Sequence, residues 1–222
     1  MTFKDFINNL SPDEKKNFID YSEIRGVQQY KIIYETLNKI NPNVTYSDIN
    51  AFIIMDKDIK DTLFTFLGTL EEYIRNDILL RFDFDIEADL SKEEYHYFNG
   101  LPPCVKKKNN PDEITEFYKR FNLNFGDLIS FIEKYDDTGK YDISKLNIIK
   151  DLRNDVMHHS PLLFNYNYES SVAKTLKRVE MLKELLPKRY QNGLIKKLKY
   201  SNDKTKENIS KKYYECLLFK ED

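Results

Sequence analysis

A long run of apolar residues at helical spacing, between residues 57 and 82, constrains the fold of this chain most strongly. The apolar positions recur at steps of three and four residues: Ile59, Leu63, Leu67, Leu70, Ile74 and Ile78. This spacing places their side chains on one face of a helix, which has to be buried against other elements. Because the 222 residues include only 6 glycines and 7 prolines, strong turn signals are few. The sequence therefore predicts an all-α fold.

Shorter periodic segments predict further helices on both sides of this one. Before it we expect helices over residues 2–10, 12–24, 27–40 and a short one ending at residue 53, capped by Thr45 or Ser47. After it we expect helices near residues 91–98, 112–121, 125–135, 142–159, 168–186, 191–199 and 204–219. Ser11 and Glu14 have the spacing of a capping box at the start of the second helix.

These helices suggest a division of the chain into three parts. Residues 1–44 form an N-terminal helical extension, residues 45–190 a helical core with an irregular insert at 83–112, and residues 191–222 basic C-terminal helices. The net charge is −2, but residues 170–222 hold 14 lysines and arginines against 7 acidic residues. Such asymmetry can build one basic surface on a nearly neutral molecule, although a solvated lysine-rich face is the simpler interpretation.

The sequence gives no sign of a membrane, a disulfide or a metal. No apolar run approaches the roughly 20 residues that span a bilayer, and the N-terminus lacks the layout of a signal peptide. Cys104 and Cys216 lie far apart, and His96 with Cys104 is not completed by a second pair of metal ligands. We therefore expect a cytoplasmic protein without a metal or another cofactor.

The best candidate for chemistry lies late in the predicted helix 142–159. Residues 152–159 read L-R-N-D-V-M-H-H, and Arg153, Asn154 and His158 form the pattern R-N-x-x-x-H. Asn154 and His158 share a helical face, whereas Arg153 lies about 140° around the helix from His158. We expect the long Arg153 side chain to bend over this flank, so that its guanidinium and the imidazole converge on one open cleft.

An arginine, an amide and a histidine are sufficient to cleave RNA without a metal. Histidine exchanges protons near neutral pH, and a position in the last helical turn favours the imidazolium. The arginine fork matches phosphate oxygens, and the RNA supplies its own nucleophile, the ribose 2′-hydroxyl. The alternative is structural: a histidine at a helix end can cap carbonyl groups, and an Arg-Asn pair can be plain surface. Spacing alone leaves both interpretations open.

The segment also resembles a known family. Residues 152–159, with Leu146 before them and Leu163-Phe164 after them, are similar to the signature of Abi-like abortive-infection proteins (the AbiD/AbiF type) of the HEPN superfamily. Upstream, residues 46–49, 61–63 and 70–78 resemble the first core helix of that family. The resemblance covers about residues 45–166 in the right order, and it does not cover residues 1–44 or the tail after about 190.

The resemblance implies a HEPN-type helical bundle that often forms a homodimer, in which two R-N-x-x-x-H motifs share a cleft. It also implies a metal-independent endoribonuclease in antiphage defence, with Arg153 and His158 as the catalytic pair and Asn154 as the polar partner. Glu71 and Arg75 match polar positions of the first core helix that face the same cleft, so their i,i+4 pair would orient Arg153 or bind phosphate.

Further RNA contacts are expected around this centre. His159 lies outside the core pattern and is a candidate RNA contact. Six lysines in two basic segments are candidates for phosphate contacts: Lys106, Lys107, Lys108, Lys196, Lys197 and Lys199. The first three follow an aromatic cluster at residues 95–98 that could stack bases, although such clusters more often belong to a core.

Three functions therefore remain at this stage. The first is an endoribonuclease whose partners are RNA, a second copy of the chain and a cognate antitoxin or inhibitor. The second is a non-catalytic protein that holds a small or structured RNA through the same basic cleft. The third is a helical bundle that binds only protein, which predicts a preparation free of RNA.

Overall fold

The computed structural model describes residues 1–84, 105–107, 124–164 and 168–218. The regular secondary structure of these residues is helical apart from one pair of three-residue strands, so the prediction of an all-α fold is confirmed. Several sequence predictions lie outside the described residues: the helices at 91–98 and 112–121, most of the insert at 83–112, His96, Cys104 and Lys108.

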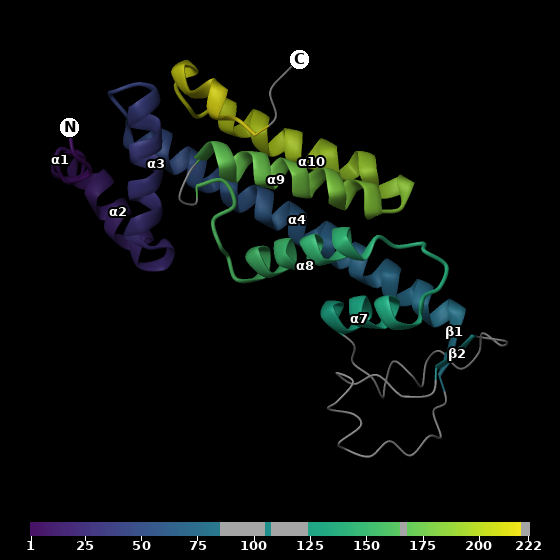
Figure 1. The fold of residues 1–222 in the computed structure, drawn as a ribbon. Coiled ribbons are helices and arrows are strands. Elements are labelled where there is room, and N and C mark those ends of the chain that lie inside the picture. Colours follow the sequence, from purple (N-terminus) through teal and green to yellow (C-terminus); the bar gives the residue numbers. More distant parts are fainter. Residues whose placement is uncertain (85–104, 108–123, 165–167, 219–222) are drawn as a thin grey trace.

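The longest helix, α4 (Tyr46–Arg81), runs through the middle of the molecule (Figure 1). Its 36 residues give it a length of about 54 Å. Thr45 closes its N-terminus: the threonine hydroxyl accepts a hydrogen bond from the Asp48 amide, and the Asp48 carboxylate accepts one from the Thr45 amide, both at 3.1 Å. This reciprocal pair satisfies two backbone donors, so the helix starts where the sequence suggested.

The prediction of two separate helices, ending at residue 53 and starting at residue 57, is wrong. Residues 54–56 lie within α4, and they contain neither glycine nor proline to break it. Met55 and Asp56 are fully buried in register with the stripe that follows. Tertiary burial therefore joins two periodic segments that looked independent.

Three of the later helices pack on α4: α10 (Lys188–Lys206), α8 (Ile143–Met157) and α7 (Phe125–Tyr135). A fourth, α9 (Tyr168–Leu185), packs against α8 and α10 (Figure 1). Helix α8 contacts α4, α7 and α9, so its position is fixed on several sides. Its buried residues are those that the periodicity predicted: Leu146, Ile149, Leu152 and Val156.

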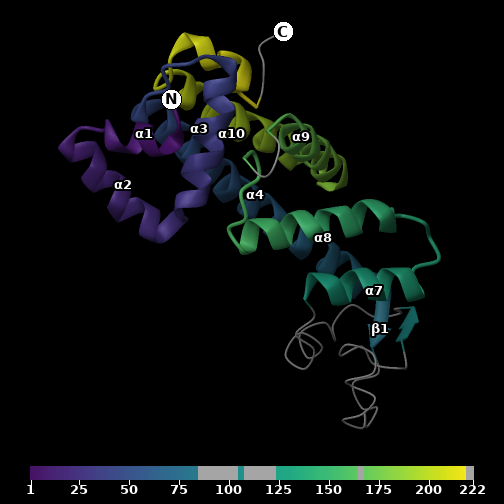
Figure 2. The ribbon, with the colours of Figure 1, turned by 60° about the vertical axis from the view of Figure 1, so that its left-hand side comes forward.

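The N-terminal helices gather at one end of this stack, α7 lies at the other, and α8 lies between them (Figure 2). The N-terminal helices are α1 (Phe3–Asn8), α2 (Pro12–Arg25) and α3 (Val27–Ile40). The expected capping box of Ser11 and Glu14 starts α2. Gly26 joins α2 to α3 at φ 79°, a conformation that glycine adopts without steric cost.

The C-terminal segment differs from its prediction. Residues 188–206 form one helix, where we expected one starting at 191 and a second starting at 204, and the short 3-10 helix η2 (Lys211–Cys216) follows it in the described residues up to 218. The chain turns before η2 because the Ser210 amide donates a hydrogen bond to the Asp48 carboxylate at 3.0 Å. Burial alone would raise the pKa of Asp48, but the hydrogen bonds from Ser210 and Thr45 outweigh it and hold this pKa below its ordinary value.

The strands β1 (Phe82–Phe84) and β2 (Val105–Lys107) pair antiparallel beyond the end of α4. Asp83 lies opposite Lys106, and Phe82 lies opposite Lys107. The prediction of an exposed loop is therefore wrong for Lys106 and Lys107, whose backbone belongs to a strand.

In the described part of the chain, no helix combines the length and the low polarity that crossing a membrane requires.

Candidate functional site

Glu71 of α4 connects the two helices on which the sequence placed its candidate residues. One carboxylate oxygen of Glu71 lies 3.1 Å from Nε of Arg153, and the other lies 2.8 Å from a terminal guanidinium nitrogen of Arg75. The three side chains are 16%, 30% and 20% exposed respectively. The carboxylate thus fixes Arg153 at the edge of a contact between α4 and α8.

The terminal nitrogens of Arg153 remain available to a ligand. In the described residues, Nε is the only guanidinium atom of Arg153 with a hydrogen-bond partner. Arg153 and Glu71 line a hollow of about 130 Å³. Its other walls are mainly apolar and come from both helices: Phe64, Leu67, Gly68, Val156 and Met157. Phe64 and Met157 are 55% and 44% exposed, so this hollow opens to solvent.

Helix α8 ends two residues earlier than predicted, at Met157, because the two histidines form its cap. The amide of His159 donates to the Val156 carbonyl at 3.1 Å, and the amide of Ser160 donates to the Asp155 carbonyl at 2.8 Å. These are the two bonds of a Schellman motif, whose turning residue is usually glycine. Here that residue is His159, at φ 56°, and both histidine side chains are exposed.

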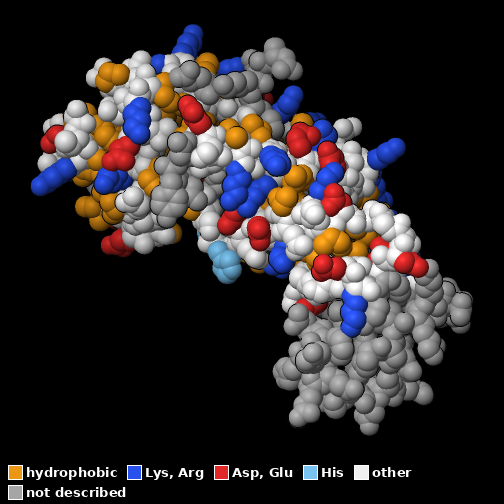
Figure 3. Space-filling view, viewed as in Figure 1, with side chains coloured by type: hydrophobic (Ala, Val, Ile, Leu, Met, Phe, Trp, Pro, Cys, Tyr) orange, Lys and Arg blue, Asp and Glu red, His pale blue; other side chains and the backbone are white. Residues whose placement is uncertain are grey.

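The histidines line a second and larger hollow, of about 490 Å³. Its other walls come from the ends of α2 and α3, from α4 and from the loop after α8: Ile24, Arg25, Gln29, Ile53, Lys57, Lys60, Asp61 and Pro161. Figure 3 shows a histidine side chain projecting at the lower edge of the helical body. Three of the lining side chains carry a fixed positive charge, and the only carboxylate among them is that of Asp61.

A buried ion pair from α4 holds the floor of this hollow. The carboxylate of Asp56, which is fully buried, accepts hydrogen bonds from the amides of Leu162 and Leu163 at 2.9 and 3.0 Å. Its second oxygen makes an ion contact with Nζ of Lys60 at 2.8 Å, without the geometry of a directed hydrogen bond. Nζ of Lys60 also donates to the carbonyl of His159 at 3.3 Å. Asp56 and Lys60 therefore fix the chain that follows the R-N-x-x-x-H motif.

The sequence analysis missed Asp56 and Lys60. The one signal that could have found them is that Asp56 follows Phe52-Ile53-Ile54-Met55, and an acidic residue in such an apolar stretch of helix needs a buried partner. Nothing in the sequence indicated that this partner would be the loop more than a hundred residues later.

The other residues of the motif face different neighbours. Asn154 is exposed. The carboxylate of Asp155 accepts a hydrogen bond from the guanidinium of Arg178 in α9, at 2.7 Å. Asp155 thus serves to join α8 to α9. The arginine and the histidine do not line the same hollow: Arg153 borders the smaller one and His158 the larger one, and the two have no lining residue in common. The five-residue step between them, about 140° of helix, keeps them apart within one chain.

The predicted lysine contacts lie away from both hollows. Lys196 and Lys199 are exposed on α10, and Nζ of Lys197 lies 5.7 Å from the centre of the Phe66 ring. Lys106 and Lys107 lie in β2. None of these lysines lines either hollow.

The described residues contain no group of three or more histidine, cysteine or acidic side chains that could hold a metal ion.

Comparisons of the chain with protein-family models, with characterised proteins and with solved structures gave no match.

Proposed function

We propose that this protein is a metal-independent endoribonuclease of the HEPN type that acts in bacterial abortive infection. The observation that carries the proposal is the Glu71 carboxylate, which fixes Arg153 on the helix that ends in two exposed histidines. A permanently charged fork and imidazoles at one helix end are the groups that phosphodiester cleavage needs.

The reaction would use the ribose 2′-hydroxyl as nucleophile. His158 accepts the proton of this hydroxyl, the 2′-oxygen bonds to phosphorus, and the bond from phosphorus to the 5′-oxygen breaks. The leaving 5′-oxygen takes its proton from an imidazolium, so the products are a 2′,3′-cyclic phosphate and a 5′-hydroxyl end. Arg153 would stabilise the negative charge on the non-bridging oxygens, and Asn154 would orient the phosphate or the imidazole.

A homodimer would bring Arg153 and His158 to a shared substrate. Within one chain these residues line separate hollows, so an active site that needs both is completed when a second copy supplies its own motif. The apolar walls of the smaller hollow, with Phe64 and Met157 exposed, are suited to such a contact. Light scattering at the concentrations used for the activity assay tests this part of the proposal.

The decisive assay incubates purified protein with single-stranded RNA in excess EDTA. Arg153→Ala and His158→Ala are expected to slow cleavage roughly a hundred- to ten-thousandfold. Arg153→Lys is expected to retain part of the rate, because lysine keeps the charge but not the fork. Lys16→Ala, on the exposed face of α2, is the matched control and should cleave like the parent. Equal cleavage by the parent, Arg153→Ala and His158→Ala would refute the assignment.

The second candidate is a non-catalytic RNA-binding protein. It is favoured by the separation of Arg153 from His158 within one chain and by exposed cations along α10, such as Lys196 and Lys199. This function predicts RNA that copurifies without turnover, an affinity that falls steeply with salt, and no effect of His158→Ala on binding. Absorbance at 260 nm of the purified protein, followed by sequencing of any bound RNA, separates the two candidates.

A further inference from the structure

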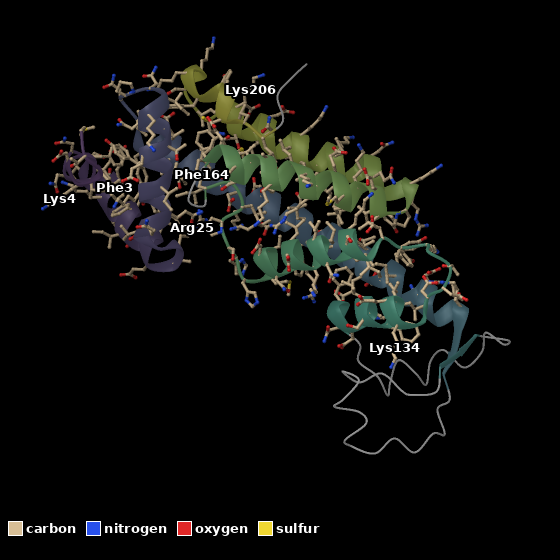
Figure 4. All side chains as sticks on the ribbon, viewed as in Figure 1. Phe3, Lys4, Arg25, Lys134, Phe164 and Lys206 are labelled. Atoms are coloured by element: carbon tan, nitrogen blue, oxygen red, sulfur yellow. The ribbon has the colours of Figure 1, made fainter. Side chains whose placement is uncertain are left out.

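The larger hollow draws on a part of the chain that the R-N-x-x-x-H motif does not include. Arg25 ends α2 and Gln29 lies in the first turns of α3, and both line the hollow opposite His158 and His159. Figure 4 places Arg25 on the side of the N-terminal helices that faces the loop after α8. The N-terminal extension is therefore one wall of the histidine site.

The cations of this hollow differ in how far they are already neutralised. Lys60 is buried and paired with Asp56 at 2.8 Å, so its charge is compensated. Lys57 lies 3.3 Å from Asp61, but both side chains are more than half exposed, and such surface pairs are weak. Among the described residues, Arg25 has no carboxylate partner, and its guanidinium lies 5.9 Å from the Tyr21 ring centre. Arg25 and Lys57 thus retain charge for an anion.

The size and the walls of the hollow fit one nucleotide. Its volume of about 490 Å³ lies in the range of small-molecule sites, roughly 300–1,000 Å³. Ile24, which is 81% exposed, and Pro161 offer apolar surface to a ribose or a base. The C-terminal end of α8 carries partial negative charge, which repels a phosphate from the last turn. The phosphate is therefore expected at the Arg25 and Lys57 side, with the sugar towards the histidines.

We infer that this hollow binds one nucleotide unit, with its phosphate held by Arg25 and Lys57 and its sugar against Ile24 and His159. The inference rests on the proposed function for its ligand class, and it adds a binding role for the N-terminal helices. The nucleotide is either an internal unit of an RNA chain or a free nucleotide, and the two sources present the same phosphate and sugar.

The test measures binding separately from cleavage. Adenosine monophosphate is titrated into the full chain while the imidazole resonances are followed by NMR, with His158→Gln and His159→Gln used for assignment. A ten-nucleotide RNA with hydroxyl groups at both ends, made uncleavable by 2′-O-methyl groups, is titrated in parallel by fluorescence anisotropy. Binding of the RNA identifies an internal unit as the ligand, and binding of the monophosphate alone identifies a free nucleotide.

Three single variants and one double variant test the residues. Arg25→Gln and Lys57→Gln are each expected to weaken binding about five- to tenfold and to reduce the slope of log affinity against log salt by about 1. Lys16→Gln removes a charge from the same helix as Arg25, outside the hollow, and should bind within about twofold of the parent. A double variant of Arg25 and Lys57 that binds both ligands like the parent would overturn the inference, as would a parent that binds neither.

These outcomes are distinguishable from those of the proposed function. A parent that cleaves RNA, together with a double variant that binds and cleaves equally well, refutes the nucleotide site and leaves the ribonuclease assignment in place. A parent that binds through Arg25 and Lys57 but does not cleave supports the site and refutes the ribonuclease. His158→Ala is expected to slow cleavage at least a hundredfold while it retains binding.

Discussion

Two charged clusters on α4, one at its C-terminal end and one in its N-terminal half, differ in how completely their charges are paired. At the C-terminal end, the Arg81 guanidinium donates two hydrogen bonds to the Asp136 carboxylate, at 2.8 and 3.2 Å, and one to Asp77 at 2.9 Å. Lys140 and the Tyr141 hydroxyl complete the surroundings of Asp77, at 2.6 and 2.9 Å. In this cluster each charge faces an opposite charge.

The cluster towards the N-terminal end has a surplus of positive charge. The Lys60–Asp56 pair is buried and satisfied, but Arg25 and Lys57 face an open hollow in which Asp61 is the only carboxylate. A cluster in which every charge is paired with an opposite charge holds helices and loops together. Cations that are only partly paired, and that line a hollow, can attract an anionic ligand. The comparison predicts that mutations in the first cluster change stability, and that mutations in the second change binding.

The largest effect on stability is expected from Arg81→Ala. This change leaves the carboxylate of Asp136, whose side chain is 1% exposed, without its cation. Breaking a buried ion pair from one side should lower the free energy of unfolding by about 3 kcal/mol, measured by urea denaturation at pH 7. Lys145→Ala, which breaks the exposed pair with Glu184, should lower the urea midpoint far less. Equal midpoints for the two variants would show that the Arg81 cluster is not structural.

Acid should weaken the same cluster. Burial raises the pKa of Asp136, but the hydrogen bonds from Arg81 and Thr138 outweigh it and lower this pKa to about 2. Because the folded pKa lies below the unfolded value, the stabilisation is complete above about pH 4 and is lost as the pH falls towards 2. The loss should reach about 2 kcal/mol.

Asp136→Asn isolates this effect. Asp48 also has a lowered pKa and loses stability over an overlapping range, so the parent alone cannot assign the change to one residue. The parent should lose stability more steeply between pH 4 and pH 2 than Asp136→Asn, as urea midpoints at several pH values would show. Parallel curves would place the acid sensitivity elsewhere.

The periodicity of apolar residues was sufficient to predict most of the helical body. The stripes through Leu70 and Ile74 and through Leu146 and Leu152 are buried as expected, because repeating positions constrain a helix without reference to its neighbours. Helix ends were predicted less well. The sequence suggested a break before residue 57 and a helix after residue 204, where burial against distant elements decides the outcome.

The candidate site was predictable only as far as local patterns extend. Glu71 and Arg153 were found together through the family resemblance, and the contact between them is present. Arg25 and Lys57 carry no local signature, because their roles depend on contacts between segments far apart in sequence. Asp56 stands out only by its apolar neighbours in the helix, and its partners Leu162 and Leu163 lie in a distant loop. The five-residue step already places Arg153 and His158 on different sides of the helix. The ion pair with Glu71 and the cap at His159 accompany this separation, and neither has a signal in the local sequence.

Glu71→Gln tests whether Arg153, which Glu71 holds in place, contributes to function and not to stability. Glutamine keeps one acceptor but loses the negative charge that holds Arg75 and Arg153, so we expect kcat for RNA cleavage to fall about tenfold. KM should not rise, because the change removes a negative charge near the substrate phosphate. Glu72→Gln, at the exposed neighbouring position, is the control and should leave both constants unchanged. A rise in KM at constant kcat would instead make Glu71 part of substrate binding.

The smallest effect, and the one that separates backbone preference from function, is expected from His159→Gly. At φ 56°, glycine removes the steric cost of the left-handed conformation, offset in part by its greater freedom in the unfolded chain. The net gain should be about 0.5 kcal/mol in the free energy of unfolding.

RNA binding by His159→Gly should weaken about twofold, because an exposed imidazole at the hollow is lost. His159→Asn keeps a residue that tolerates this conformation, so it should weaken binding with little change in stability. If the His159→Gly variant were more stable than the parent and bound RNA as tightly, the imidazole of His159 would have no role in the hollow.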